Sequence, residues 1–239
     1  FLYVNLPSAH IRFRYDSDPR GYFGPGLEVD HATNSSGFRG AEFPAVKESD
    51  AYRVVFLGDS FTFGEGVRDG DTLPERFKSL LVSKNLFTGK HAEVLNLGVG
   101  GYDTVQEAAL LRQYAASLRP DLVILVYCLN DAEPPLFLPS PTGVLKRRDR
   151  ENEVPENVGT TPVPSAFRGL RLTRMLYLAW RNFDTTRRTM AFYRSLYRES
   201  NPDWVRTQEA FSEMARFGHE QGVPVLLALY PLLFQLDDY

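Results

Sequence analysis

The stretch that decides the fold class is Val54-Val55-Phe56-Leu57-Gly58-Asp59-Ser60-Phe61-Thr62-Phe63-Gly64. A short apolar run ends abruptly at Gly58-Asp59-Ser60, and a glycine-containing segment that starts a helix follows. This pattern predicts a buried strand followed by a loop that holds the Ser60 hydroxyl at the C-terminal edge of a sheet, where open α/β sheets bind ligands. A serine there is a candidate nucleophile, which needs a base and an oxyanion hole to react.

The composition is ordinary for a soluble globular protein and limits the classes of function. The chain has 239 residues, long enough for one large α/β domain, with 43% hydrophobic and 24% charged residues. The net charge of −3 argues against nucleic acid as the main partner, because phosphate binding needs a basic surface. The single cysteine, Cys128, rules out an internal disulfide, and no apolar run reaches the roughly 18 residues of a membrane helix.

Both ends of the sequence suggest a fragment of a longer protein. The chain starts at Phe1 inside an apolar segment, and it stops at Tyr239 without a helix after the last predicted strand. We therefore expect an N-terminal signal or anchor, and a C-terminal part, to lie outside these residues. Such an anchor would allow association with a membrane or the cell envelope.

Residues 1–50 contain Pro, Gly and aromatic residues without sustained periodicity, so we expect an N-terminal arm with short strands lying over a larger domain at 51–239. From residue 51 onward, strand and helix patterns alternate, which favours βαβ units on a parallel sheet. Right-handed crossovers then predict a three-layer, flavodoxin-like α/β fold. The predicted strands are 53–57, 91–97, 122–127 and 223–229, and the predicted helices are 73–83, 104–117 and 204–220.

Residues 132–203 form a long insertion between the third and fourth predicted strands. Its first half is rich in proline and charge and is expected to be irregular, whereas 165–198 has helical periodicity. We expect a helical cap beside the C-terminal edge of the sheet, with Trp180, Tyr193 and Trp204 in its core. The cap arginines are interpreted as a solvated cationic face, and attraction of anionic polysaccharide or lipid headgroups is the alternative.

Three loops are predicted to meet at the C-terminal edge of the sheet. They are 58–60 with its serine, the glycine-rich 96–104, and 129–131 with its Asn-Asp pair. The carboxyl ends of parallel strands share one edge, so these loops would gather a hydroxyl, backbone N–H groups and a side-chain amide. A nucleophile with oxyanion donors is what acyl transfer requires.

These residues resemble the SGNH (GDSL-type) hydrolases, whose sequence blocks carry Ser, Gly, Asn and His in that order. The resemblance covers 53–131 well and 223–230 more loosely. It implies that Ser60 is the nucleophile and that the backbone N–H of Ser60 belongs to the oxyanion hole. It also implies that Gly101 supplies a second backbone donor and that the Asn130 side-chain amide is the third donor.

Segments 34–40 and 187–204 resemble those of bacterial members with an N-terminal extension and a cap insertion. The chain departs from the family pattern in two places. Cys128-Leu129 precede Asn130-Asp131 where the family has Gly-x, and the C-terminal Asp-x-x-His block that supplies the base is absent.

None of the four histidines replaces that base convincingly. His91 and His219 precede predicted strands, which puts them at the opposite edge of the sheet from the serine. His10 and His31 lie in the arm, where only an unusual fold-over would bring them near. We therefore expect the base beyond Tyr239.

The resemblance implies a serine esterase that hydrolyses an acyl ester, of a lipid or an O-acetylated carbohydrate, through an acyl-enzyme and without a cofactor. Two alternatives stay open: an O-acyltransferase acting on a carbohydrate, and an inactive envelope- or carbohydrate-binding module. The sequence shows no metal-ligand cluster. We interpret Asp59 and Asp131 as residues that hold their own loops, and Cys128 as a packing residue.

Overall fold

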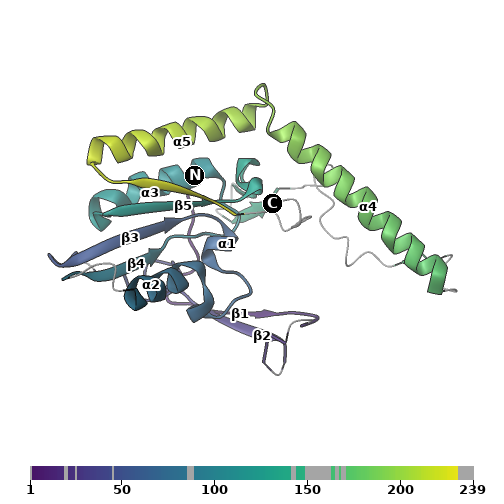
Figure 1. Cartoon of the computed structure of the whole chain (residues 1–239), viewed down its shortest axis with the longest axis horizontal. Helices are drawn as coiled ribbons and strands as arrows, with labels where there is room; N and C mark the ends of the chain where they lie inside the picture. The colour runs from purple at the N-terminus through teal and green to yellow at the C-terminus, as the bar shows by residue number, and fades with distance from the viewer. Residues whose placement is uncertain are drawn as a thin grey trace.

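The centre of the molecule is a sheet of four parallel strands (Figure 1). The computed structural model describes residues 2–18, 21–24, 26–44, 46–84, 89–140, 144–148, 163–164, 167 and 171–230. The sheet order is β4-β3-β5-β8, which is the flavodoxin-like order of an open α/β sheet. These strands are β3 (Ala51–Leu57), β4 (His91–Asn96), β5 (Leu122–Tyr127) and β8 (Val225–Leu229).

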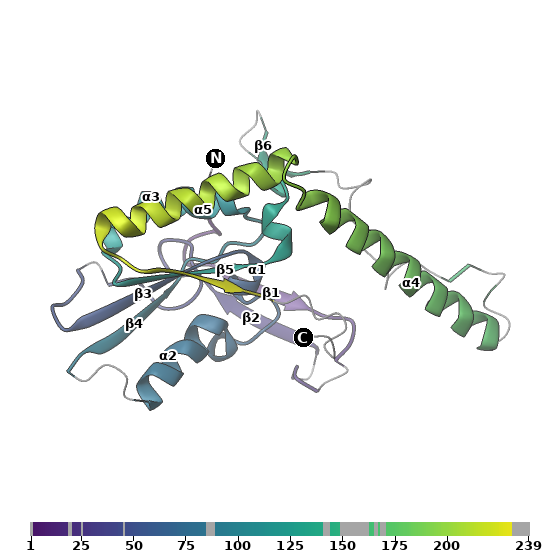
Figure 2. The same ribbon diagram turned by 45° about the horizontal axis from the view of Figure 1, so that its top comes forward.

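Helices cover both faces of the sheet, which gives the three predicted layers (Figure 2). Helix α2 (Leu73–Ser83) lies on one face, and α3 (Thr104–Leu118) and α5 (Pro202–Gln221) lie side by side on the other. The α/β prediction is confirmed, and the predicted strand and helix bounds agree with the structure to within two residues.

Burial on both faces explains the continuous apolar runs of the strands. Successive side chains of a strand point to opposite faces. Val54 and Phe56 therefore pack in the cluster on the α2 side, which contains Leu81, whereas Val55 and Leu57 pack in the larger cluster on the α3 and α5 side.

The helices begin at polar caps directly after the loops. Thr72 caps α2 by accepting a hydrogen bond from the backbone N–H of Glu75, and Asp103 forms a capping box with Gln106 at the start of α3. Asn201 caps α5, because its side chain accepts hydrogen bonds from the backbone N–H groups of Asp203 and Trp204. Three single-turn elements complete this part of the fold: α1 (Ser60–Phe63), η1 (Asp69–Asp71) and η2 (Leu129–Ala132).

The N-terminal arm folds against the sheet unit. It contains an antiparallel pair, β1 (His10–Arg14) and β2 (Glu28–Ala32), below α1 and α2 in Figure 1. Phe38 is fully buried in the main core, where its ring contacts Phe43 and Tyr114. The arm therefore shares the core of the α/β unit, and the domain bounds given above stay a prediction.

The insertion contains a short antiparallel pair, β6 (Phe137–Pro139) and β7 (Leu145–Arg147), where the sequence predicted irregular structure. It then forms one long helix, α4 (Arg171–Leu196). Residues 149–162, 165–166 and 168–170 of the predicted insertion lie outside the described residues.

Among the described residues, the C-terminal end of α4 is the part that packs on the core at the C-terminal edge of the sheet. Leu196 is buried and packs with Tyr127 and Ala132, while the rest of the helix projects away (Figures 1 and 2). Trp180 is 60% exposed in this projecting part, so its predicted place in a cap core is wrong. Trp204 does pack against Tyr197. No helix in the described ranges is long and apolar enough to cross a membrane.

Candidate active site

The structure brings the three predicted loops together around Ser60. Ser60 is the first residue of α1, directly after β3. A Cβ atom placed on Gly100 would lie 3.9 Å from the Ser60 Cβ, so the loop after β4 runs beside the serine. The Asn130 side-chain amide donates to Asp59 Oδ2 at 2.9 Å, which joins the loop after β5 to the loop after β3.

Asn96 fastens the loop after β4 to α1. Its Nδ2 donates to the carbonyl of Thr62 at 3.0 Å, and its Oδ1 accepts from the Gly98 N–H at 2.9 Å. A Cβ on Gly98 would lie 2.3 Å from the Phe63 backbone nitrogen, so only glycine fits there. We did not assign Asn96 to the site from the sequence, although a polar residue ending a buried strand is a usable signal.

The backbone carbonyl groups of Gly100 and Gly101 each accept a hydrogen bond, and these two bonds hold the loop after β4. The Gly100 carbonyl accepts from Tyr3 Oη at 2.9 Å, and the Gly101 carbonyl accepts from the Leu136 N–H at 3.4 Å. Gly101 has φ +80°, and a Cβ there would lie 2.9 Å from the Phe137 ring. Within the described ranges, the N–H groups of Ser60 and Gly101 donate no hydrogen bond, so both remain open to a ligand.

Tyr3 clamps the N-terminal arm onto this loop. Its backbone N–H donates to Tyr102 Oη at 3.1 Å, and the Tyr102 hydroxyl donates back to the Tyr3 carbonyl. The two rings meet edge to face at a centroid distance of 4.9 Å. Burial raises the pKa of Tyr102 to about 12, so its phenol stays neutral and can donate.

Buried carboxyl groups lie directly behind the loops. Asp59 Oδ1 accepts from the Phe61 N–H at 2.9 Å, and Asp131 Oδ2 accepts from the Cys128 N–H at 2.6 Å, so both hold their loops as predicted. Burial raises the pKa of Asp59 and, well above its usual value, that of Asp131.

Glu107 of α3 joins this group, and its role was not apparent from the sequence. The side chain is fully buried, and neither carboxyl oxygen has a hydrogen-bond partner among the described residues. Burial, followed by the charges of Asp59 and Asp103, raises the pKa of Glu107 well above its usual value. Because these carboxyls share a desolvated space, they cannot all be ionised together.

Two groups of side chains in the described ranges could hold a cation. Asp59, Cys128 and Asp131 each place one candidate ligand atom within 4.8 Å of the others, all buried. Both Asp59 oxygens and Asp131 Oδ2 already accept hydrogen bonds from the loops, which leaves Asp131 Oδ1 as the carboxyl oxygen without a partner among the described residues. Burial raises the pKa of the Cys128 thiol and so disfavours its thiolate as a metal ligand. The second group, exposed around His91, lies at the opposite edge of the sheet.

Replacing Glu107 by glutamine is expected to change how stability depends on pH. Because its pKa is raised in the folded state, protonated Glu107 stabilises the fold at low pH, and this contribution is lost as the pH rises through the folded-state pKa. A glutamine amide cannot lose a proton. The Tm difference between variant and parent should therefore grow in favour of the variant by about 3 °C or more between about pH 5 and pH 8.

Thermal melts across this pH range check the prediction, with the exposed Glu209→Gln on α5 as the matched control. An identical pH dependence for the two variants would contradict the burial of a protonated Glu107.

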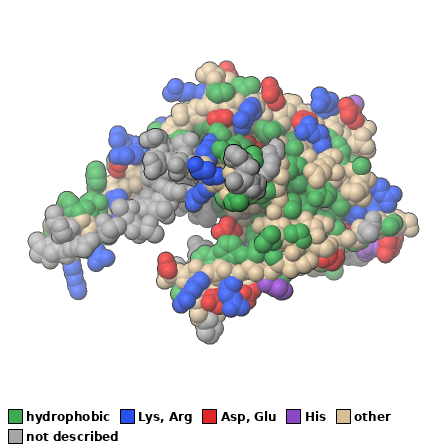
Figure 3. Space-filling model, turned by 180° about the vertical axis from the view of Figure 1, so that it is seen from behind, with side chains coloured by type: hydrophobic (Ala, Val, Ile, Leu, Met, Phe, Trp, Pro, Cys, Tyr) green, Lys and Arg blue, Asp and Glu red, His purple; other side chains and the backbone are tan. Residues whose placement is uncertain are grey.

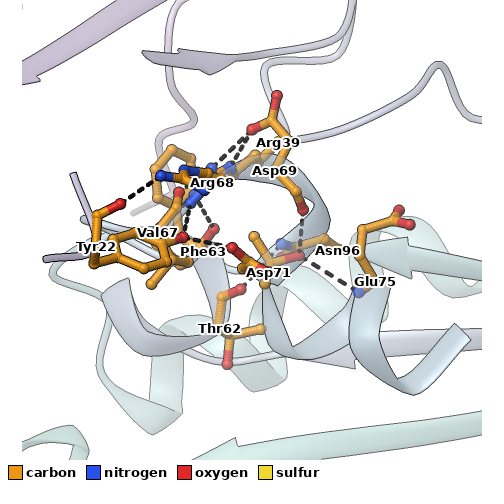
Figure 4. A network of polar contacts seen from close by, with 12 residues as sticks. Tyr22, Arg39, Thr62, Phe63, Val67, Arg68, Asp69, Asp71, Glu75 and Asn96 are labelled. Atoms are coloured by element: carbon orange, nitrogen blue, oxygen red, sulfur yellow. Dashed lines mark hydrogen bonds and ion pairs between the residues drawn. The ribbon is translucent and has the colours of Figure 1, made fainter. Parts of the chain in front are cut away.

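Arg39 of the arm braces the helix that carries Ser60 (Figure 4). Its buried guanidinium donates to the carbonyls of Phe63 and Gly64 at the end of α1, and to the carbonyl of Val67 at 2.6 Å. It also pairs with Asp69 at 2.7 Å. A planar cation with several fixed donors suits such a carbonyl cluster, and it complements the C-terminal end of a helix.

Replacing Arg39 by alanine is expected to lower the free energy of unfolding by about 2 to 4 kcal/mol, since buried carbonyls lose a charged donor. The matched control is Arg12→Ala, because Arg12 in β1 pairs with Asp30 but is 63% exposed. That surface pair should contribute at most about 1 kcal/mol. Urea unfolding measures both, and equal small losses would contradict a bracing role for Arg39.

No histidine of the chain forms a hydrogen bond with Ser60 within the described ranges. His91 starts β4, and His219 lies in the last turn of α5 ahead of β8. Both therefore lie at the edge of the sheet opposite Ser60, as predicted. His10 starts β1 and is exposed. His31 is buried between the rings of Phe13 and Phe63, where burial lowers its pKa to about 4.

Ser60 opens onto a groove of about 630 Å³. Its apolar lining includes Phe61, whose ring contacts that of Tyr230 at a centroid distance of 4.5 Å. Tyr15 of the arm and Arg76 of α2 lie on the same groove. The half-buried serine is therefore accessible from a partly aromatic surface.

These loops are those of a known hydrolase family. A model of the GDSL-like lipase/acylhydrolase family matches residues 56–233. The chain therefore belongs to this family, and its resemblance to the SGNH (GDSL-type) hydrolases is confirmed. The matched range contains all three loops and ends just beyond β8.

Solved structures with some similarity include esterases and lipases. The chain is 25% identical to AlinE4, an SGNH-hydrolase family esterase, over 33% of this chain and 41% of that one, with a TM-score of 0.28. It is 15% identical to TesA over 73% of this chain and 58% of that one, with a TM-score of 0.38. In each of these two alignments the chain spans less than two thirds of the other protein.

A GDSL-like lipase from Bacteroides thetaiotaomicron is 14% identical over 77% of this chain and 71% of that one, with a TM-score of 0.24. These TM-scores are low, so the family assignment rests on the family match. No curated protein matches the chain significantly.

Proposed function

We propose that this chain is the core of a serine enzyme that hydrolyses acyl esters, with Ser60 as the nucleophile. The observation that carries the proposal is the meeting of three loops at one edge of the sheet. The loop after β4 runs beside Ser60. The Asn130 side chain donates a hydrogen bond to Asp59, the residue before the serine. Family membership independently supports acylhydrolase chemistry.

In this proposal the Ser60 hydroxyl attacks the acyl carbonyl and forms a tetrahedral oxyanion. Three donors would hold the oxyanion: the N–H groups of Ser60 and Gly101, and the Asn130 side chain. An asparagine amide has two N–H groups, and Asp59 accepts only one hydrogen bond from it, which leaves the other for substrate. Collapse breaks the bond to the alcohol, which leaves with a proton, and water then cleaves the acyl-serine to release the acid.

The proton acceptor for Ser60 is not among the side chains that the described residues place beside its hydroxyl. The carboxyls of Asp59 and Asp131 are engaged by their own loops, and the histidines lie elsewhere. We propose that a histidine outside the 239 residues acts as the base. The groove beside Ser60 supports an ester whose acyl group is apolar, such as the acyl chain of a lipid or the acetyl group of an O-acetylated carbohydrate.

Hydrolysis of a short-chain aryl acetate by the protein as its gene encodes it tests this function. We expect aryl alcohol and acetate to appear in equal amounts. Adding a carbohydrate acceptor should leave the acetate yield unchanged. Acetylation of the acceptor in place of acetate release would show an acyltransferase, and failure to turn over any activated ester would contradict the proposal.

A further inference from the structure

Helix α4 exposes an apolar stripe along the part that projects from the domain. Its 26 residues extend about 39 Å at 1.5 Å per residue. Leu172, Leu176, Phe183 and Met190 are spaced by four, seven and seven residues, so they lie along one side of the helix. The stripe and its flanks are 38% to 70% exposed, and consist of Leu172, Met175, Leu176, Trp180, Phe183 and Met190.

Three of the six arginines of α4 lie on the side opposite the stripe, whereas Arg187 and Arg194 each follow a stripe residue by four positions and flank the stripe itself. Arg174, Arg181 and Arg188 are seven residues apart, and each is two positions from a stripe residue, about 200° around the helix. With six arginines and one aspartate, α4 carries a formal charge of +5, whereas the whole chain carries −3 and its remainder therefore −8. Positive charge is thus concentrated on α4.

Figure 3 shows hydrophobic and basic side chains together on the projecting part. A helix with Trp, Phe and Leu along one side, and with arginines beside that stripe and opposite it, fits the interface of an anionic lipid bilayer. The stripe enters the boundary between headgroups and acyl chains, and the arginines reach the anionic headgroups. We infer that α4 lies flat on a membrane surface of this kind and docks the protein there.

Two features favour a bilayer over other partners. A second copy of this chain would bring two helices of charge +5 together, and like charges oppose such pairing. An anionic polysaccharide would satisfy the arginines but would leave the apolar stripe in water. Within the described ranges, α4 packs on the core at its C-terminal end, at Leu196, so the exposed stripe can meet a flat surface without moving the sheet.

Flotation of the protein with phosphatidylglycerol–phosphatidylcholine vesicles tests the inference. Leu176→Glu should lower partitioning at least about tenfold, since a leucine that would enter the bilayer boundary is replaced by a charge. The matched control is Leu80→Glu on α2, which is similarly exposed at 51% against 58% and should bind as the parent does. Any other membrane-binding segment is common to both variants. Replacing Arg174, Arg181 and Arg188 by glutamine should lower partitioning about a hundredfold.

Tryptophan fluorescence gives a second readout. In a Trp204→Phe background, Trp180 is the remaining tryptophan, and its emission should shift to shorter wavelength with anionic vesicles but not with phosphatidylcholine alone. Equal partitioning of Leu176→Glu and Leu80→Glu would overturn the inference. It would also be overturned if the parent ignored vesicles and Leu176→Glu instead dissociated an oligomer in sedimentation velocity.

Discussion

Replacing Ser60 by alanine is expected to lower kcat for an aryl acetate at least about a thousandfold, because without the hydroxyl no acyl-enzyme can form. The side chain is half-buried at the first position of α1, and the described residues show no hydrogen bond from its hydroxyl. Its loss should therefore leave the fold intact. Steady-state kinetics with the protein as its gene encodes it measure the effect.

Ser212→Ala is the matched control, because Ser212 is an exposed serine of α5 whose hydroxyl bonds only within its own helix. It should retain the parent kcat. Unchanged hydrolysis by Ser60→Ala would remove Ser60 from the mechanism and leave the groove without its nucleophile.

Replacing Asn130 by alanine is expected to lower kcat about 100- to 1000-fold while KM changes little. An oxyanion donor acts when charge develops on the carbonyl oxygen, so its removal costs transition-state stabilisation more than substrate binding. Kinetics over a full range of substrate concentration separate the two parameters.

The Asn130 side chain also donates to Asp59, so its loss affects the loop as well as the oxyanion. Thermal melts at the assay pH measure that structural share, and Asn182→Ala on the exposed part of α4 serves as the matched control. If the fraction of unfolded protein at the assay temperature accounted for the whole loss of kcat, Asn130 would not be an oxyanion donor.

The sheet and the loops of the site could be predicted because they depend on local patterns. Apolar runs such as Leu122–Tyr127 must be buried on both faces, and parallel strands bring their following loops to one edge. Ser60 and Asn130 come three residues after β3 and β5, and Gly101 lies in the loop after β4, so a parallel sheet places all three at the same edge.

The residues that were missed act through contacts between distant parts of the chain. Arg39 braces a helix that lies 24 residues further on, and Tyr3 reaches a loop 97 residues away. Glu107 sits on a helix face whose pattern does not reveal a buried carboxyl. Trp180 was misplaced because an amphipathic pattern shows that a helix has an apolar side but not what covers that side.

The most direct test of the account is to find the nucleophile by covalent labelling. The protein as its gene encodes it is treated with a fluorophosphonate, which reacts with activated serines, digested, and analysed by mass spectrometry. The account predicts one adduct, on the peptide that contains Ser60, and none in Ser60→Ala. An adduct on another residue such as Cys128, or ester hydrolysis that persists without any adduct, would contradict it.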